Sequence, residues 1–513
     1  MAGTDEPPGQ AEQSQPAMQV IVLGSGGGPQ ENNVTALLVR SLESNWSKGS
    51  LMAVDGGVHL SAITKILEAD QPKGLGTKVP LPHVLEKGPF AGFTIHSSSA
   101  TVNAGDVIRN QIDTVLFTHS HLDHISAVVI NTAGLPGSRP KRLVGQECTI
   151  EALKTHIFNN VIWPNLSDEN NGAGLVTYLR LAEGGNPAIG DGAGKGYLEL
   201  ADGLGVKLFS VSHGHCIERK PTRGSSTFRY GSFDTSSTTA SPRGAPGSTA
   251  ASGPPSLFRG SGGGPEKDTI SVYDSSAYFI RDYTTGREIL VFGDVEPDSM
   301  SLSPRNLNIW KESAPRIANG NLVAIFIECS YDNSQSDDRL FGHLTPRYII
   351  QELQALAATV EMAAQAPLKF DSTKKRKREA EQGTNKTNNA TVADDDDRAI
   401  SPKSTRPAKK GSSATTTGPD HSGMDTPHIA TPTAEMSLTE LEADASDANH
   451  VPLTPQSANV LRGLKVIIIH VKGKLVDGDP PGDTILSQLQ KAESEARLGC
   501  EFIISSTGQS FLF

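Results

Sequence analysis

The chain has 513 residues, of which only 36% are hydrophobic, and it contains 51 Gly and 32 Pro. This length and composition indicate one sizeable folded core combined with unstructured stretches. The formal net charge of −11, from 46 basic and 57 acidic residues, argues against a protein that coats nucleic acid.

The amino-terminal residues 1–17 are polar and proline-rich, which predicts a disordered tail without the layout of a signal peptide. No apolar run approaches the roughly 18 residues that a membrane span needs. The four cysteines form no CxxC pair, and they are Cys148, Cys216, Cys329 and Cys500. We therefore expect reduced thiols in an intracellular protein, with neither a disulfide framework nor a structural zinc site.

Short apolar, β-branched runs that each end in a polar cluster recur along the chain. They cover residues 18–28, 113–124, 206–215, 287–298, 321–333 and 465–472. Near-continuous apolar runs of this length predict strands that are buried on both faces. The runs alternate with helical patterns, so we predict an α/β domain with ligand-type residues at the carboxyl ends of its strands.

Two helices have recognisable ends in the sequence. The first covers 346–362, with Thr345 as the expected N-cap and Pro346 as the first helical residue. The second covers 483–499, with Asp483 as the expected cap and Gly499 as the expected stop.

Two internal segments, 217–268 and 366–455, have the composition of disorder. We therefore predict a single domain over residues 18–513 that these two disordered insertions interrupt. The second insertion contains KKRKR at 374–378, a pattern that is typical of a nuclear localisation signal. A solvated charge run in a disordered loop is the interpretation that we favour.

The densest group of ligand-type residues is FTHSHLDH, at 117–124. His119 and His121 are two residues apart, so they point to the same side of an extended chain. Asp123 and His124 follow as the chain turns. Imidazole and carboxylate together suit zinc and related divalent metals. Four such residues exceed what one catalytic zinc takes from a protein, which predicts a pair of metals rather than a surface or capping cluster.

Other strand ends can supply the remaining ligands. His213 follows one apolar run, Asp294 follows another, and His470 follows a third. Each has an ordinary interpretation by itself, as a turn residue, a helix cap or a packed strand histidine. Their shared placement predicts that they converge, and Asp294 could bridge two cations because each carboxylate oxygen can take one metal.

These segments together resemble the metallo-β-lactamase fold and, within it, the class II cyclic nucleotide phosphodiesterases of the fungal low-affinity cAMP type. The matching stretches are LGSGGGPQENNVTALLV (23–39), VDGG (54–57), THSHLDHISA (118–127), THIFNNVIWPNL (155–166), VSHG (211–214), VFGDVEPD (291–298), IECSYDN (327–333), LFGHLTP (340–346) and GLKVIIIHVK (463–472). HxHxDH alone identifies only the superfamily, whereas HSHLDHISA combined with IFNNVIWP and LFGHLTP is much narrower.

The resemblance implies an αββα sandwich that holds two divalent metal ions, usually zinc. The implied ligands are His119, His121 and His213 for one ion, Asp123, His124 and His470 for the other, and Asp294 as the bridge. His215 remains an alternative to His213, although the SHG match favours His213. Asp55 would orient the ligands from behind.

The resemblance also implies a reaction. A metal-bound hydroxide would hydrolyse 3′,5′-cyclic nucleotides to 5′-nucleoside monophosphates and so end a cAMP signal. His343 would donate the proton to the leaving O3′ with the support of Glu328, although His343 could instead be a further ligand or a cap. We favour cAMP, and cGMP stays open because base recognition depends on pocket walls that the sequence does not locate.

Two other functions remain as alternatives. Another hydrolase of this fold, such as a tRNA 3′-end processing-type nuclease, a thioesterase or a lactamase, would use the same metals. A nuclease would be expected to carry an RNA-gripping arm or a basic surface, which we do not find in the sequence. An inactive scaffold would be expected to lack ligands, and none is missing. We therefore expect a small-molecule cyclic nucleotide as the partner, with no nucleic acid and no membrane. The expected location is cytoplasmic, and a nuclear location stays open.

Overall fold

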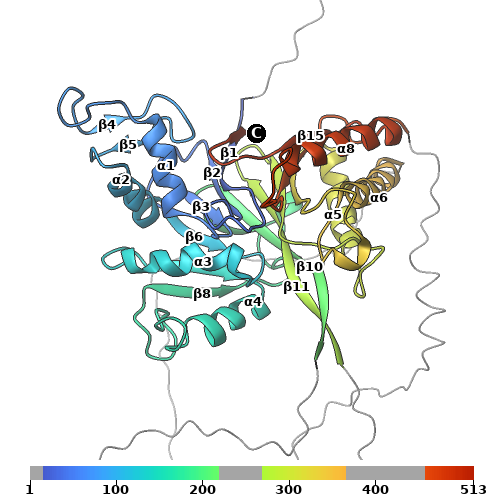
Figure 1. Cartoon of the computed structure of the whole chain (residues 1–513), viewed down its shortest axis with the longest axis horizontal. Coiled ribbons are helices and arrows are strands. Elements are labelled where there is room, and N and C mark those ends of the chain that lie inside the picture. The colour runs from blue at the N-terminus through green and yellow to red at the C-terminus, as the bar shows by residue number, and fades with distance from the viewer. Residues whose placement is uncertain (1–14, 219–268, 366–456) are drawn as a thin grey trace, which may run out of the picture. The chain divides into compact units, whose positions relative to one another are not determined.

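The computed structural model describes residues 15–218, 269–365 and 457–513, which belong to one compact unit (Figure 1). Most of the expected amino-terminal tail, both expected insertions apart from a few boundary residues, and the KKRKR run lie outside the described residues. Within the described part, no helix is long and apolar enough to cross a membrane.

Two seven-stranded sheets form the centre of the fold. The first has the order β16 (Ser510–Leu512), β1 (Met18–Gly24), β2 (Ala36–Ser41), β3 (Leu51–Val54), β6 (Ile112–Leu116), β7 (Lys141–Gly145) and β8 (Val176–Arg180). The second has the order β15 (Glu501–Ile504), β14 (Lys465–Ile469), β13 (Leu322–Glu328), β12 (Glu288–Phe292), β11 (Thr269–Asp282), β10 (Leu204–Glu218) and β9 (Leu198–Ala201). A small third sheet pairs β4 (His83–Val84) with β5 (Thr94–Ile95).

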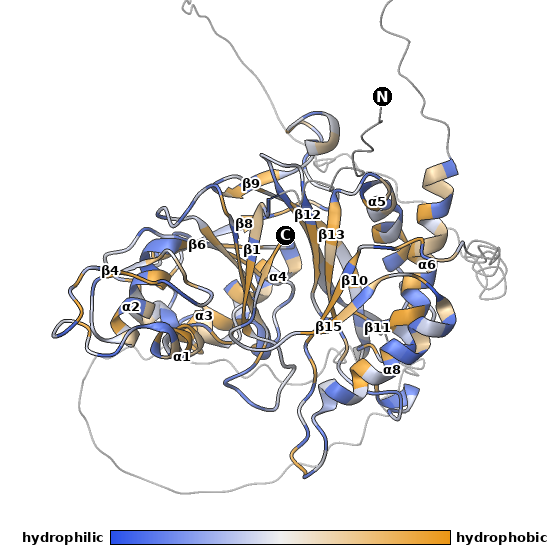
Figure 2. Cartoon of the chain, turned by 90° about the horizontal axis from the view of Figure 1, so that it is seen from above, coloured by the Kyte–Doolittle hydropathy of each residue, from blue (hydrophilic) through white to orange (hydrophobic). Residues whose placement is uncertain are grey.

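Helices cover the outer face of each large sheet (Figure 1). On the first sheet they are α1 (Leu60–Asp70), α2 (Ala100–Asp106), α3 (Leu122–Asn131) and α4 (Glu147–Ala152). On the second sheet they are α5 (Asn306–Ala318), α6 (Pro346–Gln365) and α8 (Pro481–Ala496). The apolar strands lie between these helical layers, as the orange strands in Figure 2 show.

Side-chain alternation along the strands builds the layers. In β1, Val20 and Val22 face the core between the two sheets, whereas Ile21 and Leu23 face the core under α1 and α3. The strand is therefore buried on both faces, as its continuous apolar run predicts. This arrangement confirms the predicted αββα sandwich.

The six expected strands are all present, as β1, β6, β10, β12, β13 and β14. Strand β10 continues to Glu218, two residues into the segment predicted as the first insertion. Strand β11, which pairs with β10 over most of its length, carries no continuous apolar run and was not expected.

The expected helix caps are only partly correct. Helix α6 begins at Pro346 as predicted, but the buried Thr345 hydroxyl has no hydrogen-bond partner, so its side chain does not cap the helix. Helix α8 begins at Pro481, which puts Asp483 inside the first turn, where a carboxylate favours the helix dipole. The same helix ends at Arg497, in the left-handed region with φ of 52°, and not at Gly499.

Candidate metal centre

The predicted ligands come together where several strands end. Strands β12, β13 and β14 are parallel, so their carboxyl ends share one edge of the second sheet. Asp294 follows β12 and His470 follows β14 at this edge. His213 lies on β10 at a β-bulge, where the register with β11 shifts between Ser212 and His215. The bulge re-aims the chain and presents His213 to the same edge.

The FTHSHLDH segment reaches this edge from the other sheet. His119 and His121 follow β6, and Asp123 and His124 lie in the first turn of α3. The ligand-type atoms then form two groups, each with all its atoms within 4.8 Å of one another. The groups are His119, His121, His213 and Asp294, and Asp123, His124, His470 and Asp294. We call these seven residues the His/Asp cluster; Asp294 is common to both groups, as a bridging ligand would be.

The distances within the cluster suit shared cations. His119 Nε2 and His213 Nε2 lie 3.7 and 3.6 Å from Asp294 Oδ2. His124 Nε2 lies 3.3 Å from Asp294 Oδ1, and His470 Nε2 lies 3.2 Å from Oδ2. Ligand atoms that share one tetrahedral zinc at about 2.1 Å lie about 3.4 Å apart. The carboxylate therefore sits at ligand-to-ligand distance from both groups.

Hydrogen bonds at the opposite ring nitrogens fix the tautomers. His213 Nδ1 lies 2.8 Å from the carbonyl of Gly342, which can only accept, so Nδ1 carries the proton. His124 Nδ1 donates to Asp55 Oδ2 at 2.8 Å. His470 Nδ1 lies 2.7 Å from Thr35 Oγ1, whose own proton goes to the Gly26 carbonyl. Each of these rings thus turns the lone pair of Nε2 toward Asp294, as a metal ligand must.

Asp55 supports the cluster from behind, as the resemblance implies. Its side chain is 1% exposed and accepts hydrogen bonds from His124, from the Thr118 amide and from Thr118 Oγ1. Thr118 Oγ1 in turn lies 3.1 Å from His119 Nδ1. One carboxylate therefore orients an imidazole in each of the two groups.

One cluster residue and the aspartate behind the cluster have a backbone conformation that non-glycine residues rarely adopt. Asp55 has φ of 56° and His470 has φ of 58°, both in the left-handed region. Such strain persists where the surrounding contacts over-determine it, and it is common at functional sites.

The donor set fits divalent cations because its buried atoms lack other partners. His119 Nε2, His124 Nε2, His470 Nε2 and Asp294 Oδ1 are buried and make no hydrogen bond. Leaving a buried polar atom unpaired costs about 1–3 kcal/mol, so four such atoms within the two ligand groups fit a bound cation. Imidazole nitrogen and carboxylate oxygen are the donors that zinc and similar metals prefer.

Burial and neighbouring charges shift the pKa values of the same side chains. Burial lowers the pKa of four imidazoles in the cluster, namely those of His119, His121, His213 and His470. Burial also lowers the pKa of His124, but the carboxylates of Asp294 and Asp55 outweigh it and raise that pKa well above its ordinary value. Burial opposes ionisation of Asp294, yet the nearby His470 and His124 hold its pKa well below the usual range. A proton and a metal compete for His124 Nε2, and the anionic Asp294 favours either cation.

His343 and Glu328 form a third contact group with Asp294. His343 Nδ1 lies 2.8 Å from Glu328 Oε1, and Glu328 is completely buried. The amides of Val295 and Ser330 donate to the same carboxylate and hold it in place. Burial lowers the pKa of His343, but Glu328 and Asp294 outweigh it and raise the pKa above its ordinary value. These carboxylates thereby favour the imidazolium form of His343, which can donate a proton.

His215 belongs to none of the ligand groups in the part of the chain that the structure describes. It lies instead on the wall of a cavity of about 520 Å³. The lining also includes His121, His213 and His343, so this cavity opens onto the His/Asp cluster. We call it the metal-side pocket.

Sequence reasoning missed three supporting residues, Thr35, Thr118 and Gly342. Thr118 lies inside the FTHSHLDH segment, so its position next to His119 was a usable signal. Thr35 and Gly342 contact the ligands His470 and His213 across 435 and 129 residues of chain, and no local pattern reports such contacts.

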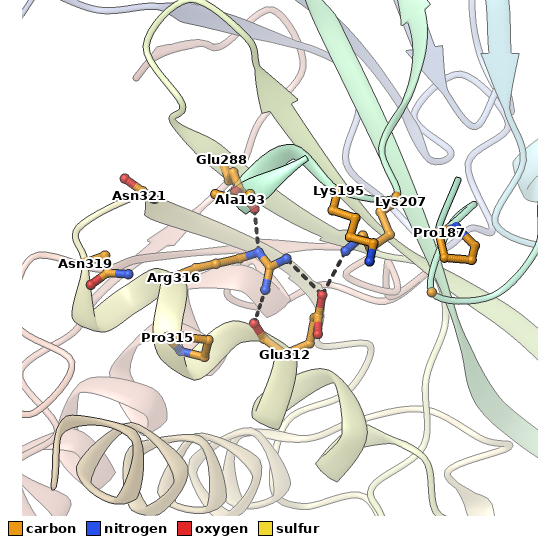
Figure 3. A pocket seen from close by; sticks show the side chains of 13 residues that line it. Pro187, Ala193, Lys195, Lys207, Glu288, Glu312, Pro315, Arg316, Asn319 and Asn321 are labelled. Carbon is orange, nitrogen blue, oxygen red and sulfur yellow. Dashed lines mark hydrogen bonds and ion pairs between the residues drawn. The ribbon is translucent and has the colours of Figure 1, made fainter. Parts of the chain in front are cut away.

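A second cavity, of about 410 Å³, lies at the other end of the second sheet, where β12 and β13 begin (Figure 3). Most of its charged side chains pair with one another. Arg316 bonds to Glu288 and Glu312 at 2.8 Å each, and Lys207 bonds to Glu312 at 3.0 Å. No predicted site residue lines this cavity, and its internally paired charges indicate a structural network.

The sequence of the chain matches a known protein family and several of its members. The family described as "cAMP phosphodiesterases class-II" matches residues 24–228, 261–370 and 438–508, which is most of the chain. A 3′,5′-cyclic-nucleotide phosphodiesterase of Schizosaccharomyces pombe is 28% identical over 358 residues, covering 70% of this chain and 80% of that protein. One of Candida albicans is 27% identical over 372 residues, covering 66% and 82%.

A solved structure shares the fold. The crystal structure of unliganded yeast PDE1 aligns with a TM-score of 0.57 at 19% sequence identity, covering 97% of this chain and 100% of that chain.

Proposed function

Because the chain belongs to the class II cAMP phosphodiesterase family and is a 3′,5′-cyclic-nucleotide phosphodiesterase, we propose that it prefers cAMP and that the His/Asp cluster is its catalytic centre. The observation that carries the proposal is the convergence of two four-residue ligand groups on Asp294. The description of the family, which names cAMP, supports the choice of substrate. The product would be the 5′-nucleoside monophosphate.

Two cations would occupy the cluster. One would be held by His119, His121 and His213, the other by Asp123, His124 and His470, with Asp294 between them. Divalent cations supply an activated water and offset negative charge on a phosphoryl group. We propose zinc because histidine-rich sites with one carboxylate suit it.

The chain itself supplies the proton for the leaving group. His343 has its Nδ1 bonded to Glu328, which leaves Nε2 to face the substrate. A protonated Nε2 would transfer its proton to the ribose O3′ as the P–O3′ bond breaks. Glu328 would stabilise the imidazolium before the transfer and keep the ring oriented afterwards.

We also propose that the protein is intracellular. The support is its cysteine usage, since Cys148, Cys329 and Cys500 are all free among the described residues.

The direct test is hydrolysis of cAMP and cGMP by purified, metal-analysed protein, with and without chelator. We expect chelator-sensitive formation of 5′-AMP and about two metal ions per chain. Faster turnover of cGMP would overturn the substrate preference. An absence of cyclic nucleotide turnover in fully metallated protein would overturn the function and make RNA and thioesters the next substrates to assay.

A pair of histidine variants tests the metal assignment. His121→Ala removes a cluster residue, so bound metal and activity should fall together. His215→Ala removes a histidine two residues beyond His213 but outside the ligand groups, so its metal content should match the wild type. Full metal content in His121→Ala, or loss of metal in His215→Ala, would overturn the assignment.

A further inference from the structure

The metal-side pocket has an apolar wall that the metal chemistry does not use. Tyr273, Met300 and Phe341 line it and come from three separate segments of the chain. These residues are 46%, 39% and 70% exposed and lie on one cavity wall, so they form a grouped apolar surface and not single scattered residues. The wall therefore presents apolar surface to whatever enters the pocket.

Phe341 is held outward by a turn that is fixed on both sides. Its neighbours Leu340 and His343 are 3% and 5% exposed, and the His343 amide donates to the Leu340 carbonyl at 3.1 Å. Gly342 packs so closely that an added Cβ would lie 2.6 Å from the Gly214 nitrogen. The Gly342 carbonyl also accepts the His213 Nδ1 hydrogen bond. The turn is thus anchored to the metal centre, and only Phe341 projects from it.

The backbone of Phe341 indicates that this projection has a use. Its φ is 54°, in the left-handed region, which is a rare conformation for a bulky residue. A strained backbone that carries an exposed phenyl ring gains nothing from packing within this chain. Strain of this kind is typical of ligand-contacting positions.

Tyr273 approaches the pocket from β11. It lies between Val272 and Asp274, whose partners across the sheet are His215 and Ser212 on either side of the β-bulge. Tyr273 therefore sits opposite the bulge that carries His213. Its ring centroid is 6.1 Å from that of His121, within the range of aromatic contact.

We propose that Phe341 and Tyr273 stack on the purine base of the cyclic nucleotide and so hold its phosphate at the His/Asp cluster. This inference rests on the proposed function. A cavity of about 520 Å³ is large enough for a nucleotide. Its described lining includes the carboxylates of Glu296, Asp337 and Asp338 but no lysine or arginine, so it favours an uncharged base over a second anionic group beside the phosphate site. Aromatic stacking recognises the face of a base and tolerates different edges, so adenine and guanine are both held.

The test measures the contribution of the base to binding separately from that of the ribose phosphate. The Ki values of 5′-AMP and ribose 5-phosphate, which differ by the base, are measured in wild type, Phe341→Ala, Phe341→Trp and Tyr273→Ala. We expect both alanine variants to raise the Ki of 5′-AMP, and the KM of cAMP and cGMP, by about 5- to 100-fold. The Ki of ribose 5-phosphate and the metal content should not change, and Phe341→Trp should keep tight 5′-AMP binding.

Met362→Ala is the matched control, since Met362 is 61% exposed but lies on α6, away from the lining of the pocket. Equal Ki values of 5′-AMP in wild type and in both alanine variants would overturn the stacking role, as would equal losses for 5′-AMP and ribose 5-phosphate. A wild type that turns over neither cyclic nucleotide would overturn the proposed function instead, so the two failures are distinguishable.

Discussion

At the scale of single residues, four histidines of the cluster are oriented by hydrogen bonds to atoms outside the cluster, and they are His119, His124, His213 and His470. His470 is an example, because its ring is fixed by the Thr35 hydroxyl at 2.7 Å. The candidate ligands could be predicted from the sequence, since each lies in the polar cluster that ends one of the apolar runs. Thr35 could not, because a threonine inside a strand-like run is indistinguishable from any other β-branched residue.

Replacing Thr35 by valine should weaken metal binding. Valine keeps the shape of threonine but cannot accept the His470 Nδ1 proton, so the ring loses its fixed tautomer and orientation. Loss of such a supporting hydrogen bond typically lowers metal affinity by about 10- to 100-fold. Competition with a chelator of known affinity measures the change.

Thr345→Val is the control for this experiment. Thr345 is also fully buried, but its hydroxyl has no partner. Its replacement should leave metal affinity unchanged and should raise the free energy of unfolding by up to about 1 kcal/mol. A similar loss of metal in both variants would show that the hydrogen bond to His470 is not the cause.

His343→Ala tests the proton donor. The variant should keep both metals, because the two ligand groups do not include His343, while kcat falls by about 10²- to 10⁴-fold. Metal analysis and steady-state kinetics on the same sample provide the measurement. His343 also forms a group with Asp294 and Glu328, so a loss of metal would identify it as a ligand and contradict its role as the acid.

At the scale of helices and strands, sequence patterns succeeded where an element is apolar throughout. Strands β12, β13 and β14 are almost entirely buried, and their continuous apolar runs predict them from the sequence. Strand β11 contains YDSS in its middle. Tyr273 lines the metal-side pocket, Asp274 pairs with Arg305, and Ser275 and Ser276 are buried polar residues. Polar and pocket-lining residues therefore interrupt the apolar pattern of β11.

Helix α6 carries a buried acid that links stability to pH. Glu352 is 4% exposed and accepts hydrogen bonds from the Asp298 amide and from Trp310 Nε1, both at 2.7 Å. Burial, together with the nearby Asp298 carboxylate, raises the pKa of Glu352 from 4.5 to about 7, against the opposing effect of these hydrogen bonds. Glu352 is therefore protonated in the folded state at pH values where it is ionised in the unfolded chain.

The sign of the pH effect follows from proton binding. Between pH 4.5 and about 7 the folded state binds more protons at Glu352, so its contribution to stability falls as the pH rises through this window. The total loss is on the order of 3 kcal/mol. Glu352→Gln cannot titrate, so its unfolding temperature should depend less on pH over this range than that of the wild type.

The unfolding temperature is measured against pH for the wild type and for Glu352→Gln. The difference between these two curves removes the pH dependence of the metal centre, which both proteins share. Glutamine can accept only one of the two hydrogen bonds, so the variant should also be less stable at pH 5. If the unfolding temperatures of wild type and variant changed with pH in the same way, Glu352 would keep an ordinary pKa.

At the scale of the whole molecule, pairing across long chain distances completes the sandwich. Strand β1 pairs with β16, which joins Gln19 to Leu512 near the other end of the chain. Short edge strands such as β16 carry too few residues to produce a sequence pattern, and their position depends on the sheet that they join. The sequence therefore predicted the central strands and the layers, but not the sheet edges.

The described residues on the two sides of each predicted insertion contact each other within the sandwich. The last residue of β10, Glu218, pairs with the first residue of β11, Thr269. The Ser457 amide donates to Glu361, near the end of α6. In both places the described chain on one side of the insertion contacts the described chain on the other.

Replacing 219–268 with a two-residue turn and 366–455 with a short Gly/Ser linker should therefore leave a folded, active core. Loop closure costs only (3/2)RT ln n, so shortening these connections cannot destabilise the sandwich through chain entropy. We expect an unchanged metal content and a kcat for cAMP within about two-fold of the wild type, which is roughly 0.4 kcal/mol in the barrier. Separate deletions serve as controls for each other: an insoluble or metal-free protein from one of them alone would show that the corresponding insertion is part of the folded structure.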